Sequence, residues 1–404
     1  MSGYFKTIGD LERATYGIGS DNILKATGAT TGIEGAHYAS GTSQTTALYN
    51  IVYGQKVWSM INREINALSM LPKKPWKSSG WRMLSSRAIG GGLDTFAVTD
   101  ADTLGGVAEN VALSGITDVK PEYTTLNVTP KTVAHTFEIS EIAQMMAGLD
   151  DGIGDLIANY REEVGITHAE VMNAMVLQDL TAVAGKGLAH SGASTEDLML
   201  TSLYKIISTH AETSAVASDF ANSEDIYGQT RHATDTPYLE SYVDSNSGTD
   251  RNLTVTLLNT ALRNLMARGG DPKVILTGYD TIQTLGELLQ AQERFMGRTE
   301  VVPSHSGIKG VSGREVGFRV ATYHDIPIIP VKDMHNGGAG LSDMLILDTD
   351  HLFLCTLKPT EYFEGGINAD VFGHGKLGHR GLYRTVAETV CTYFRGQGKI
   401  IDLQ

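Results

Sequence analysis

The sequence predicts an α+β fold in which one long helix, a helix–strand–helix layer and a strand-rich C-terminal part are joined to two extended arms. Apolar residues recur every three or four positions over 150–180, as in a helix with one buried face. Two helical patterns enclose a short apolar strand between 251 and 292, and strand patterns dominate from 317 to 396. The helix pair therefore lies within one α+β region, and the chain ends in β-sheet.

Composition limits the class of protein. The chain has 404 residues, of which 41% are hydrophobic, and a formal net charge of −14. This length predicts two or three domains with a sizeable core, and no window approaches the roughly 18 apolar residues of a membrane span. The first residues contain no apolar stretch of a secretory signal. The acidic balance argues against a protein that grips nucleic acid over its whole surface, but it is compatible with one that encloses nucleic acid without adhering to it.

The two cysteines, Cys355 and Cys391, lie in strand-like runs and form no Cys-x-x-Cys pair. Buried, reduced thiols in a protein assembled in the cytosol are the expected state. A bridge between neighbouring strands stays open, because only geometry decides it.

The N-terminal part predicts an arm followed by a helix. Residues 17–46 are rich in glycine, threonine and serine and cannot bury enough apolar surface to order themselves. We expect an extended arm that is ordered only by contact with another surface. Residues 47–70 are helical in pattern, and Pro72 and Pro75 end that segment.

Charge is separated along the next stretch, which predicts a long hairpin arm. Its first limb carries bases with no acid among them, at Lys73, Lys74, Lys77, Arg82 and Arg87. Its second limb carries acids with no base among them, at Asp94, Asp100, Asp102, Glu109 and Asp118. One hairpin is at best marginally stable alone in water. The arm is therefore expected to lie on another subunit.

The basic limb interleaves its charges with tryptophans, and three interpretations are open. This composition occurs at nucleic-acid contacts, and it also occurs on plain solvated surface. The interpretation that the sequence favours is a basic limb meeting the acidic limb of an adjacent copy, with the tryptophans as interface anchors. The predicted inter-subunit contacts are Trp76, Lys77, Trp81, Arg82, Arg87, Asp94, Asp100, Asp102 and Glu109.

The remaining elements follow in order. Residues 123–140 predict strands interrupted at Pro130, and Gly165 weakens the long helix of 150–180. The polar stretch 184–250 predicts one helix in LMLTSLYKIISTHAE and otherwise a surface loop. Further predictions are a helix from 251 to Gly269, a strand over 273–276, a helix from a capping box at 277–280 through Gln292, two strands joined by a turn over 317–331, a hairpin over 343–359 around Asp348-Thr349-Asp350, and a final strand over 383–396.

Motifs for catalysis or cofactor binding are weak. Gly152-Ile153-Gly154 is followed by Ala158, which is one residue too far along for a dinucleotide loop, and Gly185-Lys186-Gly187 lacks the rest of a phosphate-binding loop. His374 and His379 lie near Asp370, but a metal site needs three or four convergent ligands. The acids and histidine at 348–351 fit a tight turn. We therefore predict no enzyme activity, catalytic residue, cofactor or metal.

Several features in order resemble a known family. They are the N-terminal arm, the hairpin arm, PKTVAHTFEIS before a long helix, KVILTGYDTIQTLGELL, ATYHDIPIIPVKDM, MLILDTDHLFLCTLKPTEYFE and RTVAETVCTYFRGQGKI. In this order the chain resembles a major capsid protein of a tailed double-stranded DNA virus with the Hong Kong 97 type fold. The resemblance implies an N-terminal arm and helix over 1–75, an extended loop over 76–122, a peripheral domain with a spine helix over 123–182, an axial domain over 183–344 and peripheral C-terminal strands over 345–404.

The resemblance also implies a function. Copies of the chain would form the hexamers and pentamers of an icosahedral shell that encloses double-stranded DNA without sequence-specific binding. The protein would be part of the virion, assembled in the host cytoplasm, with no membrane contact, and portal and cementing proteins remain open as partners. Two alternatives are an encapsulin-like nanocompartment shell and a soluble α/β metal-dependent enzyme that uses the loop of His374 and His379.

Overall fold

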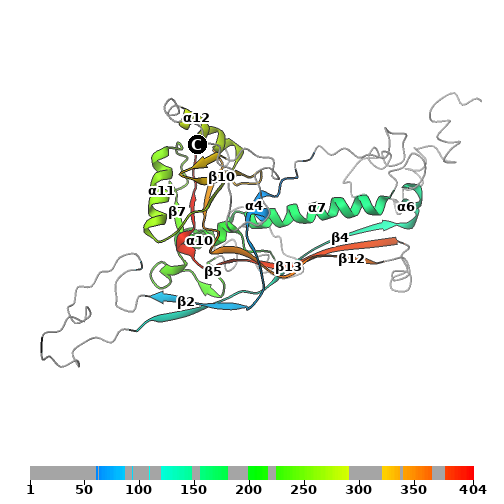
Figure 1. Cartoon of the computed structure of the whole chain (residues 1–404), viewed down its shortest axis with the longest axis horizontal. Coiled ribbons are helices and arrows are strands. Elements are labelled where there is room, and N and C mark those ends of the chain that lie inside the picture. The colour runs from blue at the N-terminus through cyan, green and yellow to red at the C-terminus, as the bar shows by residue number, and fades with distance from the viewer. Residues whose placement is uncertain are drawn as a thin grey trace, which may run out of the picture. The chain divides into compact units, whose positions relative to one another are not determined.

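The computed structural model describes residues 61, 63–86, 93, 109, 120–147, 155–180, 199–216, 224–290, 321–336, 340–365 and 378–404 (Figure 1). The chain forms two compact units. The first unit comprises Met1–Arg63, Ala134–Ala169 and Thr360–Thr385, and the second comprises Glu64–Val133, Glu170–Pro359 and Val386–Gln404. The division into five segments that the sequence suggested stays a prediction.

One helix and three long strands contribute residues to both units. Strands β1, β12, β13 and β4 form a four-stranded sheet in that order. The elements that contribute to both units are α7 (Leu156–Leu177), β4 (Lys131–Ser140), β12 (Leu352–Gly365) and β13 (Gly378–Cys391), and β1 (Lys73–Pro75) belongs to the second unit. Within the first unit, α7 and α6 (Glu141–Ala147) bury apolar residues against these strands around Phe137, Ile139, Ala143 and Leu156.

Helix α7 confirms the periodic pattern of 150–180. It begins after Asp155, whose side chain accepts the N–H of Ala158 at 3.1 Å, as an N-cap does. Gly165 lies under the Tyr383 ring, and a Cβ atom at that position would be 3.2 Å from the Tyr383 hydroxyl. The same hydroxyl donates to the carbonyl of Arg161 at 2.8 Å. The glycine that weakens the helix thus allows β13 to approach it closely.

The second unit contains a six-stranded mixed sheet in the order β7, β14, β11, β8, β10, β9. The strands are β7 (Tyr242–Asp244), β8 (Val274–Thr277), β9 (Ala321–Tyr323), β10 (Ile326–Pro330), β11 (Met344–Leu347) and β14 (Gly398–Ile400). Helices α11 (Val255–Ala267) and α12 (Tyr279–Gln290) pack their apolar residues against it. Thr254 caps α11 by accepting the N–H of Leu257, and Gly269 leaves the helix with a φ of 88°. The predicted helix–strand–helix layer is confirmed.

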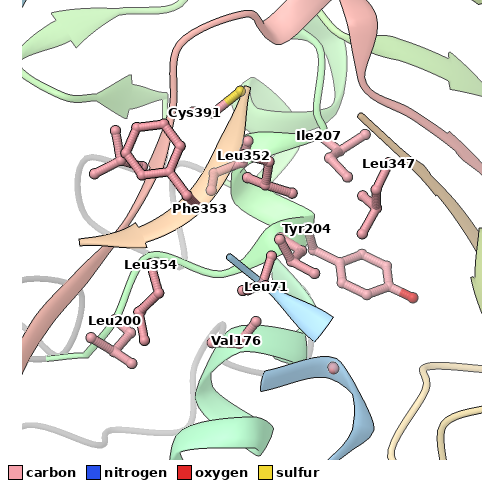
Figure 2. Packing of buried hydrophobic residues seen from close by; sticks show 14 of the residues in the cluster. Leu71, Val176, Leu200, Tyr204, Ile207, Leu347, Leu352, Phe353, Leu354 and Cys391 are labelled. Carbon is pink, nitrogen blue, oxygen red and sulfur yellow. The ribbon is translucent and has the colours of Figure 1, made fainter. Parts of the chain in front are cut away.

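A second cluster of buried residues in this unit joins many short elements (Figure 2). Figure 2 shows Leu71, Val176, Tyr204 and Leu352 converging from four separate parts of the chain. Short elements of the unit are α4 (Asn66–Met70), α9 (Leu203–Ile206), α10 (His210–Val216), β5 (Asp225–Ile226), β6 (Gln229–Thr230), η4 (Pro237–Leu239) and η6 (Phe394–Gly396). Each is too short to be stable alone, so shared burial must hold them.

The predicted hairpin over 343–359 is wrong. Strand β11 pairs with β8 and β14, whereas β12 belongs to the four-stranded sheet. The turn between them is fixed by Gln397, whose side chain accepts the N–H of Asp348 at 2.9 Å and donates to its carbonyl at 3.0 Å. The aspartates do make the expected local turn, because Asp348 accepts the N–H of Asp350. Turn chemistry therefore located the bend but not the strand pairing.

The helix predicted in LMLTSLYKIISTHAE is divided into α9 and α10. The buried guanidinium of Arg231 donates to the carbonyls of Lys205 and Ile206 at 3.1 and 3.2 Å, and so satisfies carbonyls that a continuous helix would use. Of the predicted helix over 47–70, the structure describes only α4 as helical, and most of the rest, like the N-terminal arm, lies outside the described residues. Cys355 and Cys391 are both free thiols.

Candidate assembly interface

Strands β2 (Gly80–Ser86) and β3 (Glu122–Asn127) form a two-stranded antiparallel ribbon, with β2 marked in Figure 1. The partner of β2 was not predicted, because the sequence assigned residues 123–127 to a strand after the hairpin, and the acidic limb over 94–118 lies, apart from Glu109, outside the described residues. Directly opposite residues share a face of the ribbon, and successive residues alternate between faces. One face carries the pairs Trp81–Leu126 and Met83–Thr124, and the other carries Arg82–Thr125 and Leu84–Tyr123.

The inner face of the ribbon is fixed to the second unit of its own chain. Leu126 is fully buried, and the Trp81 ring meets the Tyr227 ring edge-on with centroids 5.4 Å apart. Tyr227 in turn donates its hydroxyl to the carbonyl of Thr389 at 2.7 Å and accepts the N–H of Asn127 on its own carbonyl at 2.8 Å. The ribbon therefore has a rigid base, which sets the direction in which its outer face points.

The described residues leave the outer face of the ribbon exposed. Leu84 is 54% exposed and Tyr123 is 67% exposed, although they form one cross-strand pair. Arg82, the next outward residue on β2, is also exposed. Paired apolar side chains of this size stabilise a sheet when they are covered. We define this outer face as Arg82, Leu84, Tyr123 and Thr125.

A patch of bases lies at the start of the same segment. Lys73 and Lys74 are exposed on β1, which pairs in parallel with residues 354–356 of β12, and Lys77 follows two residues after the strand. The Lys74 ammonium lies 3.7 Å from the centroid of the Phe353 ring. Together with Arg82 these residues form the basic patch, and none of the four makes an ion pair with another described residue.

The structure describes five of the nine predicted contact residues. Lys77, Arg82 and Glu109 are exposed, and Trp76 and Trp81 pack part of their surface on the core of their own chain. The other four, Arg87, Asp94, Asp100 and Asp102, lie outside the described residues. Their contacts with a neighbour stay a prediction.

Sequence reasoning missed the pair Leu84–Tyr123. The signal was present in the alternation of GWRMLSS, where Leu84 shares a side with Arg82 rather than with Trp81. An apolar residue on the polar side of a strand is a sign of a partner surface. Its partner Tyr123 becomes visible only once the register of the two strands is known.

Among the described residues, no three histidine, cysteine or acidic side chains are grouped to hold a metal ion, and no described helix is long and apolar enough to cross a membrane. An open groove of about 520 Å³ beside the start of α7 gathers Asp155, Glu162 and Glu364 around Arg161. It presents a carboxylate cluster without a nucleophile–base pair. His379 lies on β13, and His374 is outside the described residues.

Comparisons with known proteins agree with this picture. Residues 105–370 match the family model of the SU10 major capsid protein. The capsid asymmetric unit of cyanophage A-1(L) has a similar fold, with a TM-score of 0.55 and 13% identity over 88% of this chain and 97% of that chain.

Two further structures match more loosely. A chain of Gordonia phage Cozz has a TM-score of 0.48 at 14% identity, covering 90% of this chain and 93% of that one. The holo-SrpI encapsulin complex from Synechococcus elongatus PCC 7942 has a TM-score of 0.48 at 10% identity, covering 91% and 97%. No protein of curated function matches the chain in sequence.

Proposed function

Because the chain belongs to the SU10 major capsid protein family and is a structural protein of a virion capsid, we propose that it forms the hexamers and pentamers of an icosahedral shell around double-stranded DNA. The fold is that of tailed-phage major capsid proteins, the Hong Kong 97 type. The proposal concerns how copies adhere and what they enclose. Assembly in the host cytoplasm belongs to the same proposal.

The ribbon is the observation that supports adhesion between copies. Its inner face is held by Trp81 and Leu126, so it cannot turn to bury Leu84 and Tyr123 against its own chain. Within the described residues it has no third strand, and although Tyr227 and Gln229 of the same chain meet the β3 edge at Asn127 and Thr125, the β2 edge keeps backbone groups that a neighbour can approach. A ribbon of this kind gains stability when a second copy covers its outer face.

Charge supports the choice of a second copy as the partner. The basic patch belongs to the first limb of the predicted hairpin, and every charged residue in the segment 94–118 of the same sequence is an acid. In a ring of copies, the acidic segment of one chain can meet the basic patch of the next. Each contact can be weak, because repeated contacts in a closed symmetric shell reinforce one another.

Net charge supports the proposed cargo. At −14, the chain carries an excess of acid that repels the phosphate backbone. A container with this charge can hold DNA without sequence-specific contacts and can still release it. The same charge is compatible with a shell that holds protein cargo, so the contents need a test of their own.

The outer face of the ribbon can be tested by substitution. We expect the double variant Leu84→Ser, Tyr123→Ser to fold but to lose shell formation, because it removes the apolar pair from the contact. Electron micrographs and sedimentation of the full chain would measure assembly, and circular dichroism would measure folding. The matched control is Met266→Ser, which removes a side chain that is 55% exposed on α11. Normal shells from the double variant would overturn the proposed contact.

The contents can be tested on particles isolated from the cells in which they form naturally. We expect a length of double-stranded DNA that survives nuclease treatment and is released when the shell is opened. Particles that contain a protein cargo and no protected DNA would instead identify a nanocompartment.

A further inference from the structure

Two histidines of the first unit are hydrogen-bonded directly to each other. His135 on β4 and His168 on α7 have their Nδ1 atoms 2.7 Å apart, and His168 is 1% exposed. The Nε2 atom of His168 lies 2.7 Å from the hydroxyl of Thr385 on β13, which lies 2.8 Å from the hydroxyl of Thr360 on β12. This row of four polar groups connects α7 with three strands of the four-stranded sheet.

The hydrogen bonds of this row depend on the protonation state of the two imidazole rings. A hydrogen bond between two Nδ1 atoms needs a hydrogen on one ring and a lone pair on the other. The hydroxyl of Thr385 can donate or accept, so either arrangement of the two neutral rings fits. One added proton places a charge inside the buried pair, and a second turns both Nδ1 atoms into donors that face each other. The first proton therefore adds a buried charge, and the second removes the contact that the neutral rings make.

Charges on the packed elements do not compensate such a proton. Within the described residues, neither imidazole pairs with a carboxylate, and the Tyr383 ring lies 6.1 Å from that of His168. Four acids of these elements have bases of their own, namely Glu163 with Arg63, Glu170 with Lys332, Glu138 with Arg380 and Glu361 with Arg384; Glu388 accepts the N–H groups of Thr201 and Thr389, Glu364 accepts from the Tyr362 hydroxyl, and Arg161 lies over the Tyr362 ring. Burial, and then the neighbouring His135, lower the pKa of His168 to about 4, and burial also lowers the pKa of His135.

We propose that His135 and His168 form an acid-sensitive latch that fastens α7 to the strands of the first unit while both rings are neutral and releases the helix when they take up protons. The geometry of the first unit alone carries this proposal, so it stands independently of shell assembly. A shell built from such subunits would loosen in this unit on acidification.

The direction of the pH effect follows from linkage. The pKa of His168 is about 4 in the folded chain and 6.5 when the ring is free, so the opened state binds the proton more tightly. Stability is therefore lost as pH falls from about 6.5 towards about 4, and it changes little below that range. For His168 alone, the opening equilibrium should rise roughly 30-fold between pH 8 and pH 5.

Hydrogen exchange of the full chain tests the latch locally. Peptides from α7 and from α11 would be compared between pH 7.5 and pH 4.5, with exchange times corrected for the intrinsic effect of pH. We expect protection of α7 to fall at least tenfold relative to α11 in the unchanged protein. His168→Gln should remove that extra loss, because an amide can donate and accept but does not titrate in this range. The matched control His351→Gln replaces an exposed histidine in the second unit and should keep the acid response.

Two results would overturn the latch. One is α7 protection that stays constant relative to α11 in the unchanged protein over the whole pH range. The other is an acid response in His168→Gln equal to that of the unchanged protein. Should His168→Gln fail to fold, His135→Gln serves the same comparison, and the titration of the unchanged protein decides without any variant.

Discussion

The six-stranded sheet and the β2–β3 ribbon use strands for opposite purposes. Strands β8 and β11 are buried at every residue and are flanked by other strands of the sheet on both sides. The ribbon buries one face on its own chain and leaves Leu84 and Tyr123 exposed on the other. The sheet is thus complete within one copy, whereas we propose that a second copy completes the ribbon. Stability and assembly should therefore respond to substitutions in different places.

The largest loss of stability is expected inside the six-stranded sheet. Ile346 on β11 is fully buried and lies opposite Ile275 on β8. Ile346→Ala should lower the free energy of unfolding by about 2–5 kcal/mol, because it removes buried apolar atoms and leaves a cavity. Denaturant unfolding of the unassembled subunit measures this loss. A change below about 0.5 kcal/mol would break the contrast between the two regions.

Charge reversal in the hairpin should prevent assembly and leave the stability of the subunit nearly unchanged, which is the opposite of the effect expected for Ile346→Ala. Asp94→Lys, Asp100→Lys and Asp102→Lys together should prevent shell assembly, because they place bases against the basic patch of the neighbour. The free energy of unfolding of the subunit should change by no more than about 0.5 kcal/mol for each substitution, because the reversed charges are expected to act between copies. Sedimentation and denaturant unfolding report the two quantities separately. Normal particles from this variant would remove the charge argument.

A charge swap sharpens the same test. Adding Lys73→Glu, Lys74→Glu and Lys77→Glu to the reversed hairpin restores opposite charges between copies. We expect part of the assembly to return, with Lys74→Glu costing some stability through its lost contact with the Phe353 ring. If the swapped chain assembles no better than the reversed one, the two segments do not meet.

Local sequence patterns predicted the elements whose stability is local. The helical period located α7 and α11, and the pattern over 317–331 predicted the turn between β9 and β10, where His324 and Asp325 both have positive φ. The hairpin over 343–359 was wrong because a turn motif fixes a bend without choosing the sheet on either side. The break between α9 and α10 depends on Arg231, which is 26 residues from Lys205 along the chain. Such distant capping leaves no local signal.

The candidate interface was only partly predictable for a related reason. Charge separation is a property of the sequence and was visible at once. The outward position of Tyr123 depends on its register with Leu84, which the sequence alone does not fix. The pair His135–His168 joins residues 33 apart in different elements, so their contact required the fold.

The smallest change in stability is expected at His335 of the second unit, whose contribution to stability increases with acid, whereas that of His168 decreases. His335 Nδ1 lies 2.8 Å from Asp343 Oδ2, and this hydrogen bond raises the pKa of His335. Burial also raises the pKa of Asp343, because it disfavours the charged carboxylate. The contribution of His335 is present below about pH 6.5 and is lost as pH rises through its folded pKa. His335→Gln should thus cost about 1 kcal/mol at pH 5.5 and less at pH 8.5, as measured by urea unfolding. An equal cost at both pH values would exclude a charged His335.

A reconstruction of the assembled particle by electron cryomicroscopy tests the central claim most directly. The account predicts that Leu84 and Tyr123 are covered by a neighbouring copy and that the acidic segment of one chain reaches the basic patch of another. An outer ribbon face that remains in solvent throughout the particle, with the hairpin folded onto its own chain, would contradict it.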